Sequence, residues 1–565
     1  MPPLRNKYLD RINPQRLLWR PNSCLTALLL AALAALVIVT PMISFGNSVG
    51  HDFQSHLASW MEITAQWRQG NIFPRWAEWS NWGFGEPRFI FYPPASWMLG
   101  AALGSFLPWR IVPGTMILVA MVTAGMSMWA LARRWLAETT AYVAGVLFAA
   151  NPYHLVLIYH RSDFAELLAS AIFPLIVLGT LRLFREEWSS IPLLAITVGG
   201  IWLINAPAAV IGTYSVVLLL VVGSILRRRL GPLIYGVMAL VGGFGLAAFY
   251  ILPAAWEQRW VQIAEGREGK FLPERNFLFA QNYYPNSPRI QSFNWKVSAV
   301  AVIAIAATAI GIFLCRRYMR DWSDLWWVML VLACASTFLM LPPSAFLWRH
   351  LPKLGFLQFP WRWLMPLDFT LAFFVAAASS RIRVIWLPII ILGLVPMAAV
   401  IVRDTHWDSE TVPFLAREIR SGRGYRGIQG FAPLNTQVGQ RYEDCPLIKP
   451  FDPADDSSEH LQLNIQEWTP ERKIFSAETG APVNLVLHLL NYPAWEVRVD
   501  EQTSPSHSHP VTGQLLIPLA KGIHHVEVRF RRTWDRTVGG FISLVSALGI
   551  LVATLYTRRR RDRQQ

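Results

Sequence analysis

Charged residues are scarce in this 565-residue chain: they make up 15% of it, whereas hydrophobic residues make up 53%. Soluble domains contain about a quarter charged residues, so this composition argues against an ordinary soluble enzyme. Apolar runs recur along the chain, and a run of about 20 residues crosses the ~30 Å hydrocarbon core of a bilayer. The sequence therefore predicts a polytopic α-helical membrane protein.

Cysteine is scarce too. Three of the four cysteines, Cys24, Cys315 and Cys334, lie in or beside apolar runs, and Cys445 lies alone in a polar region. This distribution supports neither a disulfide framework nor a metal site built from thiolates. Walker loops, dinucleotide-binding fingerprints and nucleophile elbows are absent from any context in which they would work. No soluble-enzyme motif therefore guides the functional prediction.

The positive charge is distributed in short blocks. The formal net charge is +15 and the isoelectric point is near 9.9, values that also suit a nucleic-acid-binding protein. However, the basic residues stand between apolar runs, which is the pattern of cytoplasmic loops in membrane proteins. The blocks are a basic tail over residues 1–23, Arg133-Arg134, Arg182 with Arg185, Arg227–Arg229, Arg316-Arg317, Arg381 with Arg383, and Arg558–Arg561.

The apolar runs predict about twelve membrane crossings with both termini in the cytoplasm. Placing every basic block on the cytoplasmic side requires crossings in pairs. The short run at 95–107 is bounded by Pro93-Pro94 and Pro108, so we expect it to dip into the membrane without crossing. The expected crossings are 24–45, 111–131, 139–152, 165–184, 190–206, 208–226, 231–254, 297–315, 325–342, 363–379, 384–402 and 537–556.

These crossings divide the chain into four parts. The polar region at 403–536 contains alternating strands, for example Val483, Leu485 and Leu487, and turns such as Lys521-Gly522. We expect a small β-rich outer domain there, built as a sandwich. The parts are the tail at 1–23, a transmembrane domain at 24–402, the β-rich domain at 403–536, and a last helix with a basic tail at 537–565; the outer loops of the transmembrane domain are expected at 46–110, 151–164, 256–296 and 343–362.

The first outer loop carries the first candidate for chemistry. Asp52 follows the first apolar run, and Asp52, His56, Ser59 and Glu62 recur at helical spacing. They predict an interfacial amphipathic helix that ends near Gly70. A negative charge in a first helical turn also suits the helix dipole. Asp52 is therefore either a helix-start residue or a functional carboxylate at the level of a lipid-linked phosphate.

The second candidate group closes the next outer loop, in the sequence His160-Arg161-Ser162-Asp163-Phe164-Ala165-Glu166. Asp163 and Glu166 have the spacing of a capping box, which needs no catalytic role. Alternatively, Arg161 can hold a phosphate through two hydrogen bonds, and the acids can position a hydroxyl or bind a divalent cation. Asp52, Asp163 and Glu166 are the candidate ligands of such a cation.

Together these features resemble the plan of the GT-C superfamily of membrane glycosyltransferases. That plan has an acidic residue just after the first helix, juxtamembrane helices in the first outer loop, a second acidic outer loop, and often a C-terminal outer domain. The matching acidic positions here are Asp52, Asp163 and Glu166. The Trp-Trp-Asp signature of oligosaccharyltransferases is absent, so the type of acceptor does not follow from the resemblance.

A narrower resemblance is to a bacterial family labelled as membrane proteins related to 6-pyruvoyl-tetrahydropterin synthase. The end of the chain, from Asn491 to Gly540, is similar to the outer module of YfhO-like proteins. No convincing zinc-histidine set for pterin chemistry accompanies these motifs. The narrower resemblance rests on Gly50-His51-Asp52, Phe73-Pro74-Arg75-Trp76, Gly83-Phe84-Gly85, Phe91-Tyr92-Pro93-Pro94 and Phe359-Pro360-Trp361-Arg362.

The resemblance implies transfer of a sugar from a polyprenyl-phosphate donor to a glycan, lipid or protein acceptor on the outer face of the bacterial inner membrane. Asp52 would be the general base of an inverting transfer. The alternative is a transporter or flippase of a lipid-linked substrate, or a non-catalytic scaffold; transporters place charges inside their spans. The residues expected to contact substrate are His51, His56, Arg75, Arg88, Tyr92, His160, Arg161, Asp163, Glu166 and Arg362.

Overall fold

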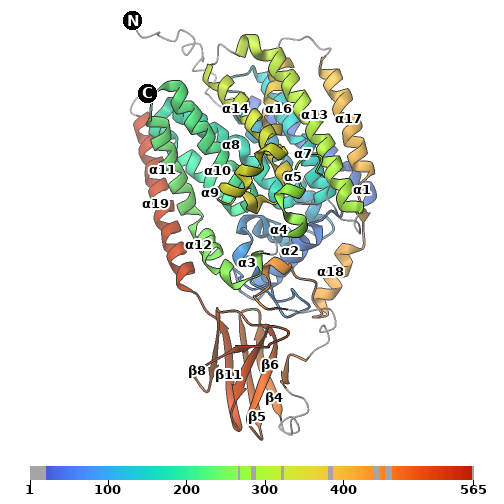
Figure 1. Ribbon diagram of the computed structural model, residues 1–565, viewed down its shortest axis with the longest axis vertical. Coiled ribbons are helices and arrows are strands. Elements are labelled where there is room, and N and C mark those ends of the chain that lie inside the picture. The colour runs from blue at the N-terminus through green and yellow to red at the C-terminus, as the bar shows by residue number, and fades with distance from the viewer. Residues whose placement is uncertain are drawn as a thin grey trace.

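The computed structural model has a helical bundle at one end and a β domain at the other, with the helices of the first long loop between them (Figure 1). The tail block up to Arg20, the block of Arg381 and Arg383, and Cys445 lie outside the described residues. The structure describes residues 21–264, 268–280, 288–319, 323–379, 386–436, 446–451 and 461–562.

The bundle contains a helix in each region where the sequence predicts a crossing. Among the described residues, seven helical segments are long and apolar enough to cross a membrane, and two bent helix pairs raise that number to nine. The protein therefore has several membrane spans, whereas the expected count of twelve is not confirmed. The helices are α1 (Pro21–Phe45), α5 (Val112–Ala132), α6 (Glu138–Ala149), α8 (Phe164–Glu186), α9 (Ile191–Ile204), α10 (Ala206–Arg227), α11 (Gly231–Leu246), α12 (Ala248–Glu257), α13 (Pro288–Met319), α14 (Ser323–Leu339), α15 (Ala345–His350), α16 (Leu364–Ser379), α17 (Trp386–Arg403) and α19 (Trp534–Asp562).

Proline and asparagine mark where several of these helices begin. Pro113 and Pro192 lie in the first two positions of α5 and α9, where a missing N–H removes no helical hydrogen bond. Asn205 precedes α10, and its Oδ1 accepts a hydrogen bond from the Ala208 N–H at 2.9 Å. The turn between α9 and α10 is thus held by a helix cap.

The apolar run at 95–107 forms α4 (Pro94–Phe106), a helix of 13 residues. It is too short to span the bilayer, and it packs against α2 (Phe53–Arg68) and α5. This agrees with a segment that does not cross.

The first prediction concerns this topology. Single cysteines at Gln69 and Ala137, both exposed positions on either side of α5, are expected to react with a membrane-impermeant maleimide from opposite sides of the membrane. The measurement uses a cysteine-free background, intact cells and permeabilised cells as the control. Labelling of both positions in intact cells would show that the segment at 95–107 crosses after all.

The expected second outer loop at 151–164 is wrong, because this segment is helical almost throughout. After α6, α7 (Pro152–Val156) and the π-helical turn η3 (Leu157–Arg161) complete one candidate span over Glu138–Arg161. Asn151-Pro152 resembles a loop start, but the Asn151 Oδ1 accepts the His154 N–H at 2.8 Å and the helix restarts there.

The helix expected after Asp52 forms as α2, but it does not lie on the surface. Its His56, Ser59 and Glu62 side chains are buried together with its apolar residues. The reason is long-range packing: the rest of the first loop and the segment around Tyr425 cover its polar face, and Tyr425 donates a 2.6 Å hydrogen bond to Glu62 Oε2. The polar face therefore holds a network inside the protein. The loop also contains α3 (Arg88–Phe91).

The β domain consists of two antiparallel sheets around one apolar core that includes Phe475, Leu485 and Val526. This confirms the expected β-rich region and adds strands that the alternation did not mark. The strand orders are β3-β6-β10-β9 and β4-β5-β11-β7-β8. The strands are β3 (Ile448–Pro450), β4 (Gln462–Thr469), β5 (Arg472–Thr479), β6 (Val483–Leu490), β7 (Trp495–Val499), β8 (Gln502–Ser504), β9 (His507–Ser508), β10 (Gln514–Leu519) and β11 (Gly522–Phe530).

The first loop and the β domain share a core. Trp76 and Phe84 are buried in the same cluster as the strands, and the His488 ring stacks on Phe84 with 3.7 Å between ring centroids. Lys473 Nζ lies 3.4 Å from Glu78 Oε1. Burial lowers the pKa of this lysine and raises the pKa of this glutamate. The first loop is thus fixed between the β domain and the bundle.

Candidate functional site

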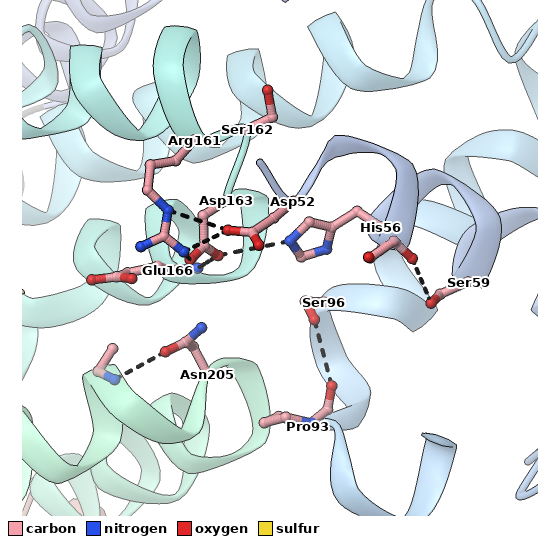
Figure 2. Close-up of polar contacts among 12 residues, drawn as sticks. Asp52, His56, Ser59, Pro93, Ser96, Arg161, Ser162, Asp163, Glu166 and Asn205 are labelled. Atoms are coloured by element: carbon pink, nitrogen blue, oxygen red, sulfur yellow. Dashed lines mark hydrogen bonds and ion pairs between the residues drawn. The ribbon is translucent and has the colours of Figure 1, made fainter. Parts of the chain in front are cut away.

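Asp52 lies at the start of α2, but its side chain does not cap the helix. Instead its Oδ2 accepts hydrogen bonds from Arg161 Nη2 at 2.5 Å and from Arg161 Nε at 3.2 Å. The Asp52 side chain keeps 37% of its surface exposed, whereas that of Arg161 keeps 6%. Figure 2 shows both groups converging with Asp163 and His56. The expected helix-start role of Asp52 therefore does not explain its side chain.

Gly50 lets the two segments that carry these charges meet. A Cβ at this position would lie 2.4–2.7 Å from the backbone of His160 and Arg161, so only glycine fits. The Gly50 N–H donates to Ser162 Oγ at 2.9 Å, and the Asp52 N–H donates to the Arg161 carbonyl at 2.9 Å. These contacts fix Asp52 beside Arg161 through the backbone.

Asp163 does cap α8, because its Oδ1 accepts the Glu166 N–H at 3.0 Å. It is also an ion-pair partner: Arg161 Nη2 lies 3.1 Å from its Oδ2, and His56 Nε2 lies 3.7 Å from its Oδ1. Burial alone would raise the pKa of this carboxyl group. The contact with His56 and the charges of Arg161 and Arg362 outweigh burial and hold the pKa of Asp163 well below the ordinary value.

A second arginine continues the network into the bundle. Arg362, from the expected motif Phe359-Pro360-Trp361-Arg362, places Nε 2.9 Å from Glu166 Oε2. The other oxygen of Glu166 accepts the Tyr153 hydroxyl, and the Tyr153 N–H donates to Asp368 Oδ2 at 2.9 Å. Tyr153 and Asp368 are polar groups that the sequence analysis missed. Asp368 could have been noticed in the sequence, because it is a single acidic residue inside an apolar run and such acids are often functional.

Arg161 retains a donor that the protein does not use. Its Nη1 is buried and has no hydrogen-bond partner in the described part of the chain. Its guanidinium carbon lies 5.2 Å from the Trp361 ring centroid and 5.4 Å from that of Phe359. Buried donors are rarely left without an acceptor. This group, next to the half-exposed Asp52, is therefore a donor without an acceptor in the described part of the protein.

Tyr92 and His56 border the cluster. Their rings meet edge to face with 5.8 Å between centroids. Burial and the neighbouring charges of Asp163 and Asp52 raise the pKa of Tyr92 well above its ordinary value, so Tyr92 is a neutral hydroxyl at physiological pH. Both residues were expected to contact substrate, and both lie beside the acids.

Two other expected histidines face a different neighbour. His51 and His160 both contact the Phe293 ring, at centroid distances of 4.9 Å and 6.3 Å. His160 Nε2 lies 3.0 Å from the Ile401 carbonyl oxygen, so one of its nitrogens is engaged by α17. These two histidines therefore meet at the Phe293 ring of α13.

The structure does not bring Arg75 and Arg88 into the cluster. The Arg75 guanidinium stacks on Phe73 at 4.3 Å, next to the β domain; burial and the neighbouring charge of Arg536 lower its pKa to about 10. Arg88 is 1% exposed, and its donors contact Glu86, Ser59, Ser80 and Tyr425. The expectation that Arg88 contacts substrate is at odds with this geometry, because its N–H groups are engaged inside the protein.

Glu62 lies in this same buried network. It accepts hydrogen bonds from Tyr425 Oη at 2.6 Å and from the Trp79 N–H at 3.0 Å. Burial dominates and raises its pKa to about 8, although the two hydrogen bonds and Arg88 act in the opposite direction. Its carboxyl group is therefore largely protonated in the folded protein at neutral pH.

The second prediction follows from Glu62. Its pKa in the folded protein lies above the value of 4.5 for an exposed glutamate, so the folded state binds the proton more tightly than the unfolded state. This contribution to stability is complete below about pH 4.5 and decreases as the pH rises toward 8. Glu62→Gln is expected to flatten the fall of the Tm between about pH 5 and pH 8. Glu410→Gln, an exposed control, should leave the profile unchanged; identical profiles for all three proteins would contradict the prediction.

The acids of the cluster face arginines rather than one another. Among the described residues, no three or more His, Cys, Asp or Glu side chains are arranged to hold a metal ion. The three candidate ligands Asp52, Asp163 and Glu166 therefore do not form a ready metal site in this geometry.

No curated protein matches the chain. A family model described as "6-pyruvoyl-tetrahydropterin synthase related domain; membrane protein" matches residues 89–405, more than half of the chain. The matched region includes Arg161, Asp163, Glu166 and Arg362, and Asp52 precedes it. The chain therefore belongs to the membrane protein family of the 6-pyruvoyl-tetrahydropterin synthase related domain.

Proposed function

We propose that the protein is a GT-C-type glycosyltransferase that moves a sugar from a polyprenyl-phosphate donor to an acceptor on the outer face of the bacterial inner membrane. One observation carries the proposal: a half-exposed carboxylate, Asp52, lies beside a buried arginine, Arg161, that has a free N–H group. Asp52 follows the first candidate span and Arg161 ends the span Glu138–Arg161, so the pair lies at the ends of two spans, where a lipid-borne phosphate and a water-borne acceptor can meet.

In the proposed reaction, the acceptor hydroxyl attacks the anomeric carbon of the donor. The new C–O bond forms as the bond between that carbon and the phosphate oxygen breaks. Asp52 takes the hydroxyl proton, and polyprenyl phosphate leaves with the electron pair of the broken bond. A single displacement inverts the anomeric configuration.

The arginines supply the charge that the leaving phosphate needs. Arg161 and Arg362 both approach Asp163 Oδ2, at 3.1 Å and 3.8 Å. Fixed cations in a site shielded from water stabilise developing negative charge strongly. A phosphate bound to Arg161 would also compete with Asp52 for its N–H groups, which frees the Asp52 oxygens to accept a proton.

The test compares membrane vesicles from a deletion strain with vesicles from the same strain complemented with the protein. Polyprenyl-phosphate sugars are added singly, and transfer to endogenous acceptors is followed by mass spectrometry together with surface glycan analysis of intact cells. Sugar incorporation that depends on the protein supports the proposal. A deletion strain with unchanged surface glycans, and no incorporation from any donor, would refute it.

A transporter of a lipid-linked substrate is the second candidate, and Asp368 is the observation that favours it. This residue is fully buried in α16, and its Oδ1 has no partner among the described residues. Acids inside membrane spans often mark transport pathways.

The third prediction separates these two functions. Under the transferase proposal Asp368 only accepts the Tyr153 N–H, and Asn retains that acceptor, so Asp368→Asn should keep sugar transfer within about threefold of wild type, less than a lost catalytic group would cost. If the protein moves a substrate through this acid, the same variant should lose translocation of a fluorescent lipid-linked sugar across proteoliposomes. Loss of translocation with a matching loss of surface glycan would favour the transporter.

A further inference from the structure

We infer that the exposed arginine face of α18 (Thr411–Arg420) and the residues after it binds anionic phospholipid headgroups of the adjoining membrane leaflet. The arginine face consists of Arg417, Arg420, Arg423 and Arg426, all exposed. The inference goes beyond the proposed glycosyl transfer and does not depend on it.

The position of α18 relative to the membrane spans supports this inference. The short strand β2 (Trp407–Asp408) precedes α18 and pairs with β1 (Asn47–Ser48), which directly follows α1. The Asp408 carboxylate accepts the Thr411 N–H at 3.2 Å and so anchors the start of the helix. Figure 1 shows α18 below the ends of α1 and α17, level with α2 and α3. The helix therefore begins at the depth where the first candidate span ends.

Aromatic residues mark the same depth. The Phe45 and Trp407 rings lie 5.5 Å apart, and Phe45 is 61% exposed at the end of α1. Aromatic side chains concentrate at the boundary between hydrocarbon and headgroups. Phe414 on α18 is 46% exposed as well, whereas Val412 and Leu415 are buried. The helix packs against α2 and turns an aromatic and basic face outward.

The charge of this face is only partly neutralised by the residues that the structure describes. The segment 411–426 contains four arginines and one acid, Glu418, which lies 3.5 Å from Arg423. Arg420 Nε donates to the Ala416 carbonyl at 3.0 Å. Arg417 and Arg426 have no acidic partner in the described part of the chain.

A favourable interaction with the helix dipole explains the presence of only some of the four arginines. Basic residues in a last helical turn are favourable because they meet the negative end of the dipole, and that suits Arg417 and Arg420. Arg423 and Arg426 lie beyond the helix end and gain nothing from it. A leaflet that contains anionic lipids is the negative surface available at this depth, and exposed arginines bind such headgroups through charge.

The test uses a photoreactive probe placed next to the arginine face. Benzoylphenylalanine replaces Phe414 in the full-length protein, which is reconstituted in vesicles of equal parts phosphatidylcholine and phosphatidylglycerol. We expect phosphatidylglycerol to be captured at least about threefold more often than phosphatidylcholine, with the preference lost at about 1 M salt. A local probe is needed because basic blocks elsewhere in the chain also attract anionic lipid.

Two sets of variants separate charge from structure. Changing all four arginines of the face to Gln should bring the capture ratio close to one, whereas changing them to Lys should preserve the preference. A probe at Leu548, an exposed position in the span α19, should show no preference in either background. The matched control changes four exposed basic residues of the β domain to Gln and should leave the ratio at 414 unchanged: Arg498, Lys521, Arg529 and Arg531.

Equal capture of both lipids by the wild-type face would overturn the inference. Capture of a second copy of the protein instead of lipid would also overturn it, because the face would then be a protein interface. Retention of the preference in the glutamine variant would show that the arginines are not its cause.

Discussion

Asp52→Asn is expected to lower sugar transfer by about 10²–10⁴-fold, the usual contribution of a positioned general base. Asparagine keeps the shape of the side chain but cannot take the proton of the acceptor hydroxyl. Its amide oxygen can still accept from Arg161, and the backbone hydrogen bond from Asp52 N–H to the Arg161 carbonyl is unchanged. The fold should therefore survive while transfer nearly vanishes. The measurement is the rate of incorporation in vesicles, together with surface glycan in the complemented deletion strain.

Glu410→Gln is the matched control, because it removes an exposed carboxylate at the start of α18 without touching the cluster. It should transfer sugar like the wild type. Donor binding should persist in Asp52→Asn, since the arginines remain. If Asp52→Asn restores normal glycan while the deletion strain lacks it, Asp52 is not the base, although the protein is still required for the glycan.

The grouping of Asp52, Arg161, Asp163 and Arg362 could be anticipated from the sequence. Each lies at an end of a long apolar run, and residues at equivalent ends of membrane spans share one boundary of the bilayer. The sequence pattern could not tell which charges pair. Those pairings depend on Gly50 and on the backbone contact between Asp52 and Arg161, which join positions 109 residues apart.

Two features of the fold could not be predicted from local sequence patterns: the burial of the polar face of α2 and the helix that restarts at Asn151-Pro152. Periodicity predicted α2 with a polar face and, reasonably, placed that face in water. The group that covers it, Tyr425, is 363 residues away from its partner Glu62, and no repeat or spacing announces such a contact. Likewise, Asn151-Pro152 is a turn signal in most contexts, and here tertiary packing lets the helix restart. Local sequence signals indicate where helices begin, whereas the burial of a polar helix face depends on contacts with residues far away in the sequence.

The last prediction concerns Arg88, which the sequence analysis expected to contact substrate. Arg88→Met should leave substrate contacts intact but destabilise the first loop by about 3–5 kcal/mol, the usual cost of removing one partner of a buried ion pair. The reason is that Glu86 is 0% exposed and its Oε1 is 2.7 Å from Arg88. Thermal unfolding and trypsin sensitivity of the purified protein measure the loss, and Arg68→Met, an exposed arginine of α2, is the control.

A second substitution tests whether Arg88 acts as the ion-pair partner of Glu86 or as a substrate ligand. In an Arg88→Met background, Glu86→Gln removes the uncompensated charge and should recover part of the lost Tm, because a buried carboxylate without a cation is the main penalty. Asn81 Nδ2 and the Ile428 N–H still reach position 86, at 3.0 Å and 3.1 Å from the Glu86 Oε2, so a neutral amide can be held there. An Arg88→Met protein that keeps its Tm but loses sugar transfer would instead make Arg88 a substrate ligand. The cluster around Asp52 would then extend along α2 to a second arginine.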